Sequence, residues 1–595
     1  MNSYRTHHCG ELSQKEVSQK VTLSGWVGSR RDHGGLIFID LRDRYGMTQI
    51  VFNPETCPEA HTSAQKFRDE FVISIQGVVA KRPQNMVNAK MSTGEIEILV
   101  DTVVLLSSSE VIPFQIEDDV EASEVTRLKY RYLDLRRPAL QKNMVIRHQL
   151  NHTIRNFLNQ ERFLEIETPY LTKSTPEGAR DYVVPSRVHK GKFFALPQSP
   201  QLFKQLLMIS GMDRYYQIVR CFRDEDLRSD RQPEFTQLDM ELSFTTQREI
   251  QHIIEQLMVR IMKETIGIDI PTPFTRMSYQ EAMSSYATDK PDLRYPLPLV
   301  ELSSIVKNTE FQVFQKIMHA KGEIRGIKIP GGNSLSRSQI DTLTKDIQSY
   351  GAKGLVWIRK NQNTLSSSIE KFLSQNELEN ISAALELQDQ DLGLIVADQP
   401  SIARSSLSQI KSDVLSKMNY PVDHPWAFLW VEDFPLFEYD AEQKRYVSIH
   451  HPFTSPHPED LSNVMEKKNL SSIRSNAYDL VLNGYEIGGG SIRIHQNELQ
   501  QIIFSILGLS EAEAKEKFGF FLEALQYGTP PHGGIALGLD RIAMLLAKSD
   551  SLRDIIAFPK TQNAYDLMVD APSTISIDQL LELHLSLLEK KGSSS

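Results

Sequence analysis

The chain has 595 residues, which predicts roughly three to five domains because one domain usually holds about 100 to 200 residues. Hydrophobic residues make up 40% of the chain, charged residues 24% and aromatic residues 8%, a composition that excludes disordered, collagen-like and coiled-coil proteins. The net charge of -10 argues against a histone-like or polybasic nucleic-acid binder. We therefore expect a multidomain globular protein.

The cysteines and the distribution of apolar residues indicate the cellular compartment in which the protein works. Cys9, Cys57 and Cys221 are far apart and form no C-x-x-C pair, so neither a disulfide framework nor a thiolate metal site is indicated. The N-terminal segment lacks the apolar core of an export signal, and no run of about 18 apolar residues occurs. We expect a cytoplasmic protein.

The segment from Val21 to Leu106 predicts a small β-barrel. It holds five short stretches rich in Val, Ile and Phe, with a helical interval from Glu59 to Phe71 between the third and the fourth. This is the element order of an OB-fold, which commonly binds single-stranded nucleic acid through aromatic and basic side chains. Phe38 and its neighbouring arginines suit that role, but alternating Phe and Ile are also typical of a core, so both interpretations remain open.

A strongly basic segment follows the barrel. Residues 127–148 carry seven basic side chains against one acid, Asp134, and residues 110–124 carry six acids and no base. Such a segment could neutralise phosphates or could be a solvated linker, and composition does not distinguish the two.

The rest of the chain predicts a large α+β domain with an insertion. Residues 138–162 have the periodicity of a long amphipathic helix, and Pro169 interrupts the extended segment that follows. Strand patterns return near residues 215–226, 235–244, 428–437, 478–495 and 533–546, the last passing into a helix. Between them, residues 295–418 are polar and rich in Ser and Gln, which indicates an inserted domain.

Three separated segments carry the chemistry. The chain lacks G-x-x-x-x-G-K-[ST] and a strand-linked G-x-G-x-x-G, so a nucleotide site needs another design. The strings VRCFRDED at 219–226, RQPEFTQLD at 231–239 and GGIALGLDR at 533–541 resemble the second and third signature motifs of class II aminoacyl-tRNA synthetases. The long helix and FLEIETPYL resemble the first motif. The strings QSPQLFKQLLM, IHHPFT and YEIGGGSIRIH extend the resemblance, over nearly the whole chain, to the bacterial type of aspartyl-tRNA synthetases.

This resemblance implies a multidomain α+β architecture. It has an N-terminal OB-fold barrel, an antiparallel-sheet catalytic domain and an inserted α/β domain of the GAD type. The implied boundaries are 1–108 for the anticodon-binding barrel, 109–137 for a hinge, 138–294 and 419–562 for the catalytic domain, 295–418 for the insertion and 563–595 for a C-terminal extension.

The resemblance also implies the reaction. Such enzymes join the aspartate carboxylate to the ATP α-phosphate, release pyrophosphate, and transfer the aspartyl group to the 3′-terminal adenosine of a tRNA. Fixed cations must stabilise the developing charge, so Arg223 and Arg541 are the expected catalytic residues. Arg223 would contact the α-phosphate and the substrate carboxylate, and Arg541 the γ-phosphate and one face of the adenine, with Phe235 stacked on the other.

The implied ATP-binding residues are Arg223, Asp224, Glu225, Gln232, Phe235, Glu486, Gly538, Leu539, Asp540 and Arg541. The implied aspartate-binding residues are Glu177, Ser199, Gln201, Lys204, Arg223, Asp239, His450 and Arg493. Arg493 and Lys204 would bind the side-chain carboxylate of the substrate. Judged from the residues alone, His450 and His451 could equally be structural histidines. Asp479 and Glu486 match the family's Mg²⁺ ligands, although isolated acids of this kind are usually surface charges.

For the tRNA, the resemblance implies that Phe38 stacks on an anticodon base, with Arg30, Arg31 and Gln49 nearby. His33 occupies a loop position where family members that also charge tRNA(Asn) tend to carry His and strict bacterial members tend to carry Leu. We therefore expect a non-discriminating enzyme that charges tRNA(Asp) and tRNA(Asn), forms a homodimer through the first motif, and depends on a tRNA-dependent amidotransferase.

Three alternatives remain open at this stage. The first is a discriminating enzyme that charges tRNA(Asp) alone. The second is a catalytically inactive OB-fold RNA-binding paralogue, which the presence of Arg223, Asp479, Glu486, Arg493 and Arg541 opposes. The third is an asparaginyl- or lysyl-tRNA synthetase, which the pairing of Lys204 with Arg493 opposes, since two cations favour an acidic substrate side chain.

Overall fold

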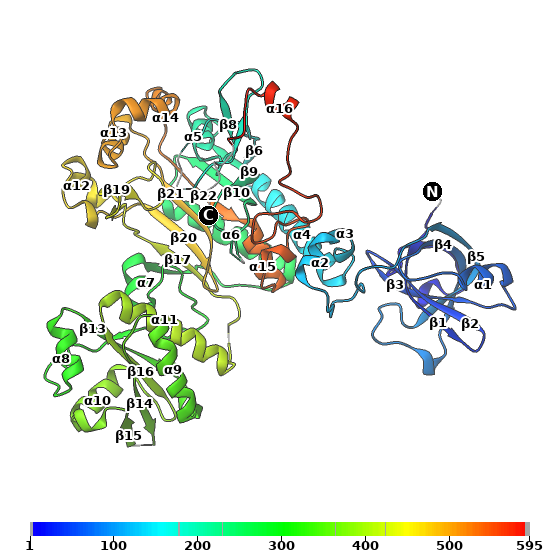
Figure 1. The fold of residues 1–595 in the computed structure, drawn as a ribbon, viewed down its shortest axis with the longest axis horizontal. Helices are drawn as coiled ribbons and strands as arrows, with labels where there is room; N and C mark the ends of the chain where they lie inside the picture. The colour runs from blue at the N-terminus through cyan, green and yellow to red at the C-terminus, as the bar shows by residue number, and fades with distance from the viewer. Residues whose placement is uncertain (1–3, 176–178, 229, 363, 423, 589–595) are drawn as a thin grey trace, which may run out of the picture. The chain divides into compact units, whose positions relative to one another are not determined.

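The computed structural model describes residues 4–175, 179–228, 230–362, 364–422 and 424–588. The chain forms two compact units, one of residues 1–147 and 549–574 and the other of residues 148–548 and 575–595. Figure 1 labels their elements along the chain. Within the described ranges, no helix is both long and apolar enough to cross a membrane.

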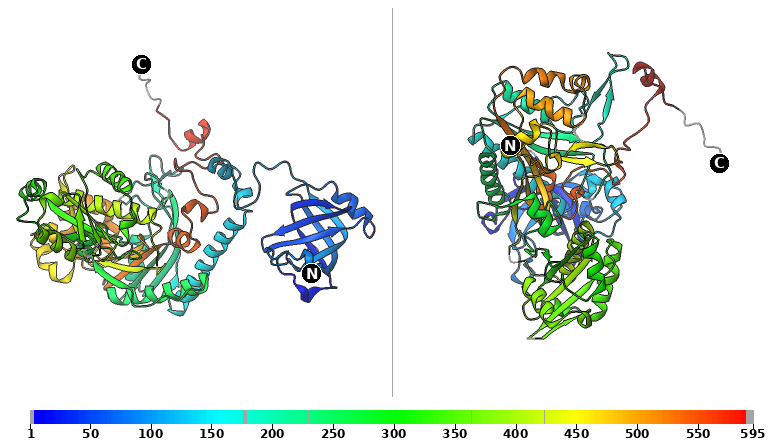
Figure 2. Two further views of the ribbon diagram at one scale, coloured as in Figure 1. Left: turned by 90° about the horizontal axis from the view of Figure 1, so that it is seen from below. Right: turned by 90° about the vertical axis from the view of Figure 1, so that its left-hand side faces the viewer.

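A closed five-stranded barrel forms most of the first unit, with the strands in the order β1-β2-β3-β5-β4 (Figure 2). The strands are β1 Lys20–His33, β2 Leu36–Asp43, β3 Gly46–Phe52, β4 Val72–Lys81 and β5 Ile96–Ser107. Helix α1, Pro58–Ala64, lies between β3 and β4, which confirms the predicted OB-fold order. Ile37, Ile39 and Leu41 alternate into the core, so Phe38 lies on the outer face of β2.

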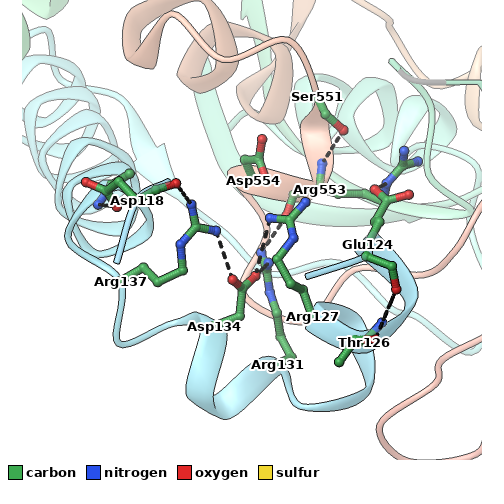
Figure 3. A network of polar contacts seen from close by, with 12 residues as sticks. Asp118, Glu124, Thr126, Arg127, Arg131, Asp134, Arg137, Ser551, Arg553 and Asp554 are labelled. Atoms are coloured by element: carbon green, nitrogen blue, oxygen red, sulfur yellow. Dashed lines mark hydrogen bonds and ion pairs between the residues drawn. The ribbon is translucent and has the colours of Figure 1, made fainter. Parts of the chain in front are cut away.

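The hinge helices α2, Glu124–Lys129, and α3, Arg131–Asp134, contain a buried ionic network (Figure 3). The Asp134 carboxylate is fully buried and accepts from Arg131 Nη1 at 2.6 Å and from Arg137 Nη1 at 2.9 Å. Arg131 also donates to the backbone carbonyls of Arg553, Ile556 and Ala557, in the segment that follows residue 548. This network therefore ties the hinge to residues 553–557 of the same unit.

The basic segment 127–148 is consequently neither a solvated linker nor a continuous surface for phosphates. Arg131 and Arg137 are buried, and Arg136 pairs with Glu70 of the barrel at 2.7 Å. Lys129 and Lys142 remain exposed. Phosphate contact, one of the two roles that the composition left open, is therefore not a role of Arg131 and Arg137, because their charges are paired inside the fold.

The second unit is built on an eight-stranded sheet with the order β11-β17-β20-β21-β22-β10-β9-β6. The six central strands, from β17 to β9 in this order, pair antiparallel with their neighbours. At the two edges of the sheet, β11 pairs in parallel with β17 and β6 pairs in parallel with β9. The strands are β6 Leu164–Glu165, β9 Arg214–Phe222, β10 Glu234–Ser243, β11 Thr275–Ser278, β17 Phe428–Glu432, β20 Ala477–Leu482, β21 Tyr485–Ile492 and β22 His532–Gly538. This confirms the predicted antiparallel-sheet domain.

Helices and two small hairpins surround this sheet. The helices are α4 Pro138–Gln160, α5 Gln201–Ile209, α6 Gln247–Ile266, α7 Tyr279–Tyr286, α12 Leu461–Met465, α13 Asn497–Ile506, α14 Glu511–Ala524, α15 Leu539–Ala547 and α16 Ile577–Glu582. The hairpins are β7 Val183–Pro185 with β8 Phe193–Ala195, and β18 Phe437–Asp440 with β19 Arg445–Ser448. The long helix predicted from residues 138–162 is therefore α4.

The insertion has a sheet of its own. Strands β11 and β17 are neighbours in the large sheet, and the chain between them forms a five-stranded antiparallel sheet in the order β12-β13-β16-β14-β15. Its elements are β12 Val300–Glu301, α8 Gln312–His319, β13 Glu323–Ile329, α9 Arg337–Ser349, β14 Val356–Asn361, β15 Thr364–Ser367, α10 Gln375–Ala384, β16 Leu392–Asp398 and α11 Pro400–Lys417. The segment is polar in composition because its helices are amphipathic. Their apolar residues are buried in two clusters.

Removing the carboxylate of Asp134 leaves two buried guanidinium groups without their shared counter-charge. We predict that Asp134→Ala lowers the free energy of local unfolding of residues 124–137 and 552–557 by about 3 to 5 kcal/mol. Native-state hydrogen exchange of the backbone amides of these residues measures this free energy of local unfolding. Asp32→Ala, which breaks an exposed pair with Arg30, is the control and should cost less than about 1 kcal/mol. Equal exchange in the two variants would contradict a stabilising role for the network.

Candidate active site

The central strands bring acidic and very small residues together on one face of the large sheet. Across neighbouring strands Asp479 lies opposite Gly489, Gly489 opposite Ala536, and Ala536 opposite Asp239. Directly opposed residues point to the same face, so two carboxylates flank a floor of small side chains. The next row on this face runs from Ser491 through Gly534 to Glu241.

Two glycines leave the room that these carboxylates occupy. A Cβ atom on Gly489 would lie 2.7 Å from Asp479 Oδ1 and 3.7 Å from Glu486 Oε1. A Cβ atom on Gly534 would lie 2.1 Å from Glu241 Oε2. A side chain at either position would therefore displace a carboxylate from the floor of the site.

An irregularity in β21 places Glu486 beside Asp479. Leu480 pairs with Gly488, but the next residue, Val481, pairs with Glu486, so Ile487 is an extra residue in the strand. This bulge turns Glu486 to the same face as Asp479. The negative charge of Asp479, together with burial, raises the pKa of Glu486 above its ordinary value. The two carboxylates form a site that favours a cation.

Four buried charges form the centre of the site. Arg493 donates from Nε to Glu241 Oε1 at 2.9 Å and from Nη2 to Glu241 Oε2 at 3.2 Å. Lys204, on α5, lies 3.1 Å from Asp239 Oδ1 and 3.4 Å from Glu241 Oε2. All four side chains are at most 2% exposed. The structure therefore brings together Lys204, Asp239 and Arg493, as the sequence predicted, and adds Glu241.

The two acids of this cluster differ in their electrostatic environment. Burial acts to raise the pKa of Glu241, but the charges of Arg493 and Lys204 outweigh it and hold that pKa below its ordinary value. For Asp239, burial dominates and raises the pKa, although Lys204 opposes it. Glu241 is thus the fixed counter-ion of Arg493, and Asp239 is the acid whose charge still lacks full compensation.

Several buried polar side-chain atoms near this cluster have no hydrogen-bond partner among the described residues. Among them are Asp239 Oδ2 and Gln201 Nε2. Buried polar groups of this kind are costly unless something pairs with them. An acceptor and a donor beside two cations suit a small zwitterion that has an ammonium group and carboxylates.

The adjacent histidines have different roles. His451 Nε2 accepts from Arg493 Nη1 at 2.7 Å, and burial together with the Arg493 charge holds the pKa of His451 well below its ordinary value. His450 Nε2 lies 3.5 Å from Asp479 Oδ1. Burial would lower the pKa of His450, but Asp479 outweighs it and raises that pKa. His450 therefore lies at the acidic pair, while His451 orients Arg493.

Glu241 and His451 are the residues that sequence reasoning missed. Glu241 follows Asp239 by two positions in β10, so strand periodicity places both on one face. That signal was available in the sequence. No such signal distinguished His451 from His450, because the choice depends on which ring faces Arg493.

Arg223 of the second motif and Arg541 of the third have different partners. The Arg223 guanidinium carbon lies 5.1 Å from the centroid of the Phe235 ring. Arg541 donates from Nη2 to Asp230 Oδ2 at 3.2 Å and from Nη1 to the backbone carbonyl of Glu486. The two arginines thus lie at an aromatic ring and at the acidic pair, positions from which cations can bind phosphates.

Several predicted ATP-binding residues have structural contacts of their own. Asp540 is buried and its Oδ2 accepts from the backbone N–H of Thr236 at 2.7 Å, which joins α15 to β10. Leu539 is buried at the start of α15, and Gly538 is the N-cap of that helix. Gly538 therefore lies at a helix N-terminus, whereas Leu539 and Asp540 fix the position of that helix.

The remaining predicted pocket residues lie around α5 and the loop of the second motif. Ser199 Oγ accepts from Gln201 N–H at 3.3 Å, and Gln201 and Gln232 are buried. Asp224 N–H donates to Arg180 O at 3.1 Å, and Glu225 pairs with Arg231 at 3.0 Å. Glu177 lies outside the described residues.

Three of the four predicted anticodon-contact residues, Phe38, Arg31 and Gln49, lie on one outer face of the barrel, whereas Arg30 is opposite Ile39 and belongs to the other face of β1. Phe38 is half-buried and opposite Arg31. Arg31 forms a bidentate pair with Asp40 at 2.8 and 3.0 Å, and Gln49 donates to Glu97 at 2.8 Å.

The turn between β1 and β2 carries His33. Gly34 and Gly35, with φ of 59° and 83°, complete a two-residue turn that requires glycine. His33, just before them, is exposed. Arg30, farther from the turn on β1, pairs with Asp32 at 2.9 Å. Each arginine thus pairs with an acid of its own face, Arg30 with Asp32 on one side of β1 and Arg31 with Asp40 on the other.

Two family comparisons match most of the chain. Residues 123–562 match the family described as tRNA synthetases class II (D, K and N). Residues 21–106 match the family described as OB-fold nucleic acid binding domain.

Similar proteins cover the whole length of the chain. A protein named Aspartate-tRNA(Asp/Asn) ligase from a Thermoanaerobacter species is 54% identical over 98% of this chain and 98% of its own. A protein named Aspartate-tRNA ligase from Halalkalibacterium halodurans is 52% identical over 99% of this chain and 98% of its own.

The solved structure of an asparaginyl-tRNA synthetase from Pyrococcus horikoshii with asparaginyl-adenylate matches the fold with a TM-score of 0.59. It is 19% identical and the match covers 93% of this chain and 98% of that one, so this likeness shows the fold alone. The family matches and the close relatives, by contrast, show which family the chain belongs to. The chain belongs to the class II tRNA synthetases of the D, K and N group, and within it to the aspartate-tRNA ligases.

Proposed function

We propose that this chain activates L-aspartate with ATP and transfers the aspartyl group to the 3′-terminal adenosine of tRNA(Asp) and tRNA(Asn). The buried cluster of Lys204, Asp239, Glu241 and Arg493 carries this proposal. The names of the close relatives support it. As a ligase that consumes ATP and tRNA, the enzyme would work in the cytoplasm.

The cluster has the charges that aspartate needs. Lys204 and Arg493 face the substrate side-chain carboxylate, and Asp239, whose Oδ2 has no hydrogen-bond partner among the described residues, accepts the ammonium group. Before substrate binds, the two cations are balanced by Asp239 and Glu241. The side chain of asparagine carries no charge, so the cations would lose the stabilisation that they gain from the side-chain carboxylate of aspartate.

ATP fits the neighbouring residues of the second and third motifs. Phe235 offers a ring on which the adenine can stack, and Arg223 and Arg541 bind the α- and γ-phosphates. Gln232 lies between these groups in the chain, and the N-terminus of α15 at Gly538 adds backbone N–H donors. Glu177, Ser199, Gln201 and His450 complete the proposed aspartate site.

Mg²⁺ would be held by Asp479 and Glu486. No group of three or more His, Cys, Asp or Glu side chains arranged for a metal occurs in the described parts of the chain. Two carboxylates nevertheless suit Mg²⁺, which is usually bound by one or two carboxylates together with substrate phosphates and water. Asp479 Oδ1 is buried and has no hydrogen-bond partner among the described residues, which suits an oxygen that binds a cation. When bound, the ion would neutralise phosphate charge.

The chain's residues then have defined tasks in the two steps. An oxygen of the aspartate α-carboxylate attacks the α-phosphorus of ATP, the bond to the β-phosphate bridging oxygen breaks, and pyrophosphate leaves. Arg223 stabilises the charge that develops on the α-phosphate. In the second step the 3′-hydroxyl of the tRNA attacks the aspartyl carbonyl, and AMP leaves. Catalysis in both steps depends on position and fixed charge.

The outer face of the barrel is the proposed anticodon site. Phe38 provides the stacking ring, Arg31 and Gln49 lie on its face, and Arg30 is the next residue along β1. Relaxed specificity rests on His33 and on the name Aspartate-tRNA(Asp/Asn) ligase of several relatives. A discriminating enzyme is the alternative, because the Halalkalibacterium halodurans relative is named Aspartate-tRNA ligase. A relaxed enzyme also needs an amidotransferase for Asp-tRNA(Asn).

A homodimer would form through the first motif. Leu164, Tyr170 and Leu171 are between 43% and 53% exposed in and after β6, an edge strand of the large sheet. Exposed apolar residues at one edge mark an interaction surface. A second copy of the same edge would cover it in an isologous interface.

The first prediction concerns the clamp for the aspartate side chain. Arg493→Lys keeps the charge but loses the planar fork that Glu241 and His451 orient. The KM for aspartate should rise about 100-fold or more, with the KM for ATP changed less than about threefold, because truncating a buried charge pair costs about 2 to 5 kcal/mol. Aspartate-dependent exchange of pyrophosphate into ATP measures both constants. A parallel rise in the two would indicate a general folding defect instead.

The second prediction concerns the anticodon face. Phe38→Ala should raise the KM for tRNA about 10- to 100-fold, since one stacked base contributes about 1 to 3 kcal/mol. Aspartate-dependent pyrophosphate exchange, which needs no tRNA, should stay unchanged. Phe372→Ala, at an exposed phenylalanine of the insertion, is the matched control. Equal loss of charging and exchange in Phe38→Ala would refute a specific tRNA role.

The third prediction tests tRNA specificity. The purified protein should charge separately transcribed tRNA(Asp) and tRNA(Asn) with aspartate, and His33→Leu should reduce charging of tRNA(Asn) more than that of tRNA(Asp). His252→Leu, at an exposed histidine of α6, is the control. Charging of tRNA(Asp) alone by the unmodified protein would support the discriminating alternative and reject relaxed specificity.

A further inference from the structure

The hairpin of β7 and β8 projects from the second unit with a well-defined turn (Figures 1 and 2). Val183, Val184 and Pro185 pair with residues 193–195. Lys192 N–H donates to His189 O at 3.0 Å, and Ser186 N–H donates to Lys192 O at 2.9 Å. Gly191 takes the left-handed conformation that the turn requires, with φ of 71°. Backbone hydrogen bonds and the bond from His189 N–H to Ser186 Oγ at 3.1 Å thus define the turn and leave its basic side chains available.

Those side chains are basic and have no acidic partner. Arg187, Lys190 and Lys192 are exposed, and the sequence contains no acidic residue between Asp181 and Asp213. Within the described residues, none of the three cations forms an ion pair. The whole chain has a net charge of -10, so this positive segment contrasts with the rest of the molecule. Their charges have no structural use and are available to a polyanion.

Aromatic side chains accompany the cations. Phe193 is 47% exposed and Phe194 is 37% exposed, although both belong to β8. Successive strand residues point to opposite faces, so each face of the hairpin carries one exposed ring. Exposed rings next to unpaired cations are the combination that binds unpaired nucleotides, through base stacking and phosphate contacts.

The root of the hairpin lies at the proposed aspartate site. Ala195 forms a bridge with Thr172, and Pro197 O accepts from the N–H of Phe222, the residue before Arg223. Ser199 follows Ala195 by four residues. Lys190 precedes Ala195 by five positions, so their backbones are at most roughly 17 Å apart, and closer because Gly191 lies in the turn. A tRNA whose terminal adenosine reaches the aspartyl group would have its preceding unpaired nucleotides within this distance.

We propose that the β7–β8 hairpin binds the unpaired 3′-terminal nucleotides of the tRNA, with Arg187, Lys190 and Lys192 on phosphates and Phe193 or Phe194 against a base. This inference rests on the proposed function and deepens it. A second copy of the chain fits the hairpin less well. In an isologous contact the cations of one copy would face those of the other, with no acid in the segment to compensate them.

The test compares two charge-reversed variants of the full-length protein. Lys190→Glu with Lys192→Glu alters the hairpin. Lys444→Glu with Lys515→Glu makes the same change in charge at two exposed lysines of the same unit, one of them in the β18–β19 turn. For each variant we would measure the KM for tRNA in charging, aspartate-dependent pyrophosphate exchange, and the oligomeric state by sedimentation.

The hairpin variant should raise the KM for tRNA at least about tenfold, because two phosphate contacts are replaced by repulsion. Its pyrophosphate exchange and oligomeric state should equal those of the unmodified protein, and the control variant should change none of the three. An unchanged KM for tRNA would overturn the proposal. A changed oligomeric state would overturn it in favour of a self-association surface. Failure of the proposed function itself would appear separately, as absence of aspartate-dependent exchange in the unmodified protein.

A second measurement locates the contact on the tRNA. Phe193→Ala with Phe194→Ala should weaken binding of intact tRNA at least about tenfold, since stacking contributes about 1 to 3 kcal/mol per base. A tRNA that lacks its unpaired 3′ nucleotides should bind equally to this variant and to the unmodified protein. A similar loss of affinity for both RNAs would contradict contact with the 3′ end.

Discussion

The pairing of Arg493 with Glu241 is the interaction on which the site depends. A guanidinium group that is 2% exposed can remain charged only if a fixed counter-ion compensates it, and Glu241 does so through two hydrogen bonds. Lys204 and Asp239 extend the cluster to two cations and two acids. The pocket is therefore electrically balanced before a substrate enters. A zwitterion with a second carboxylate can join this cluster by pairing with groups that are already oriented.

The sheet makes this cluster possible because the residues of β21 and β22 that face it are very small. Gly489, Gly534 and Ala536 provide the floor, and a Cβ atom on Gly534 would collide with Glu241. The bulge at Ile487 then turns Glu486 to the face of Asp479. Arg541, which contacts the backbone of Glu486 and the carboxylate of Asp230, joins the third motif to the second. Substrate charge, metal charge and phosphate charge can thus be stabilised from one surface of one sheet.

Much of this arrangement could be predicted from the sequence. The Val-, Ile- and Phe-rich segments predicted the strands of the barrel, although they left open whether Phe38 is a core residue. The resemblance to the family implied that Lys204, Asp239 and Arg493 line one pocket, and the structure brings them together. Contacts that depend on three-dimensional packing could not be predicted. The buried environment of Arg131 requires carbonyl groups of residues 553–557, more than 400 positions away. The choice between His450 and His451 likewise depends on side-chain direction. Relaxed tRNA specificity and the individual tRNA contacts remain predictions.

The most direct test of this account is pyrophosphate exchange into ATP by the unmodified protein, with aspartate compared with asparagine as the amino acid. Two cations compensated by fixed acids should favour a carboxylate over an amide, so kcat/KM for aspartate should exceed that for asparagine by about 10³-fold or more. Exchange that is equal for the two amino acids, or that is absent with aspartate, would contradict the assignment of Lys204 and Arg493 to the substrate side chain.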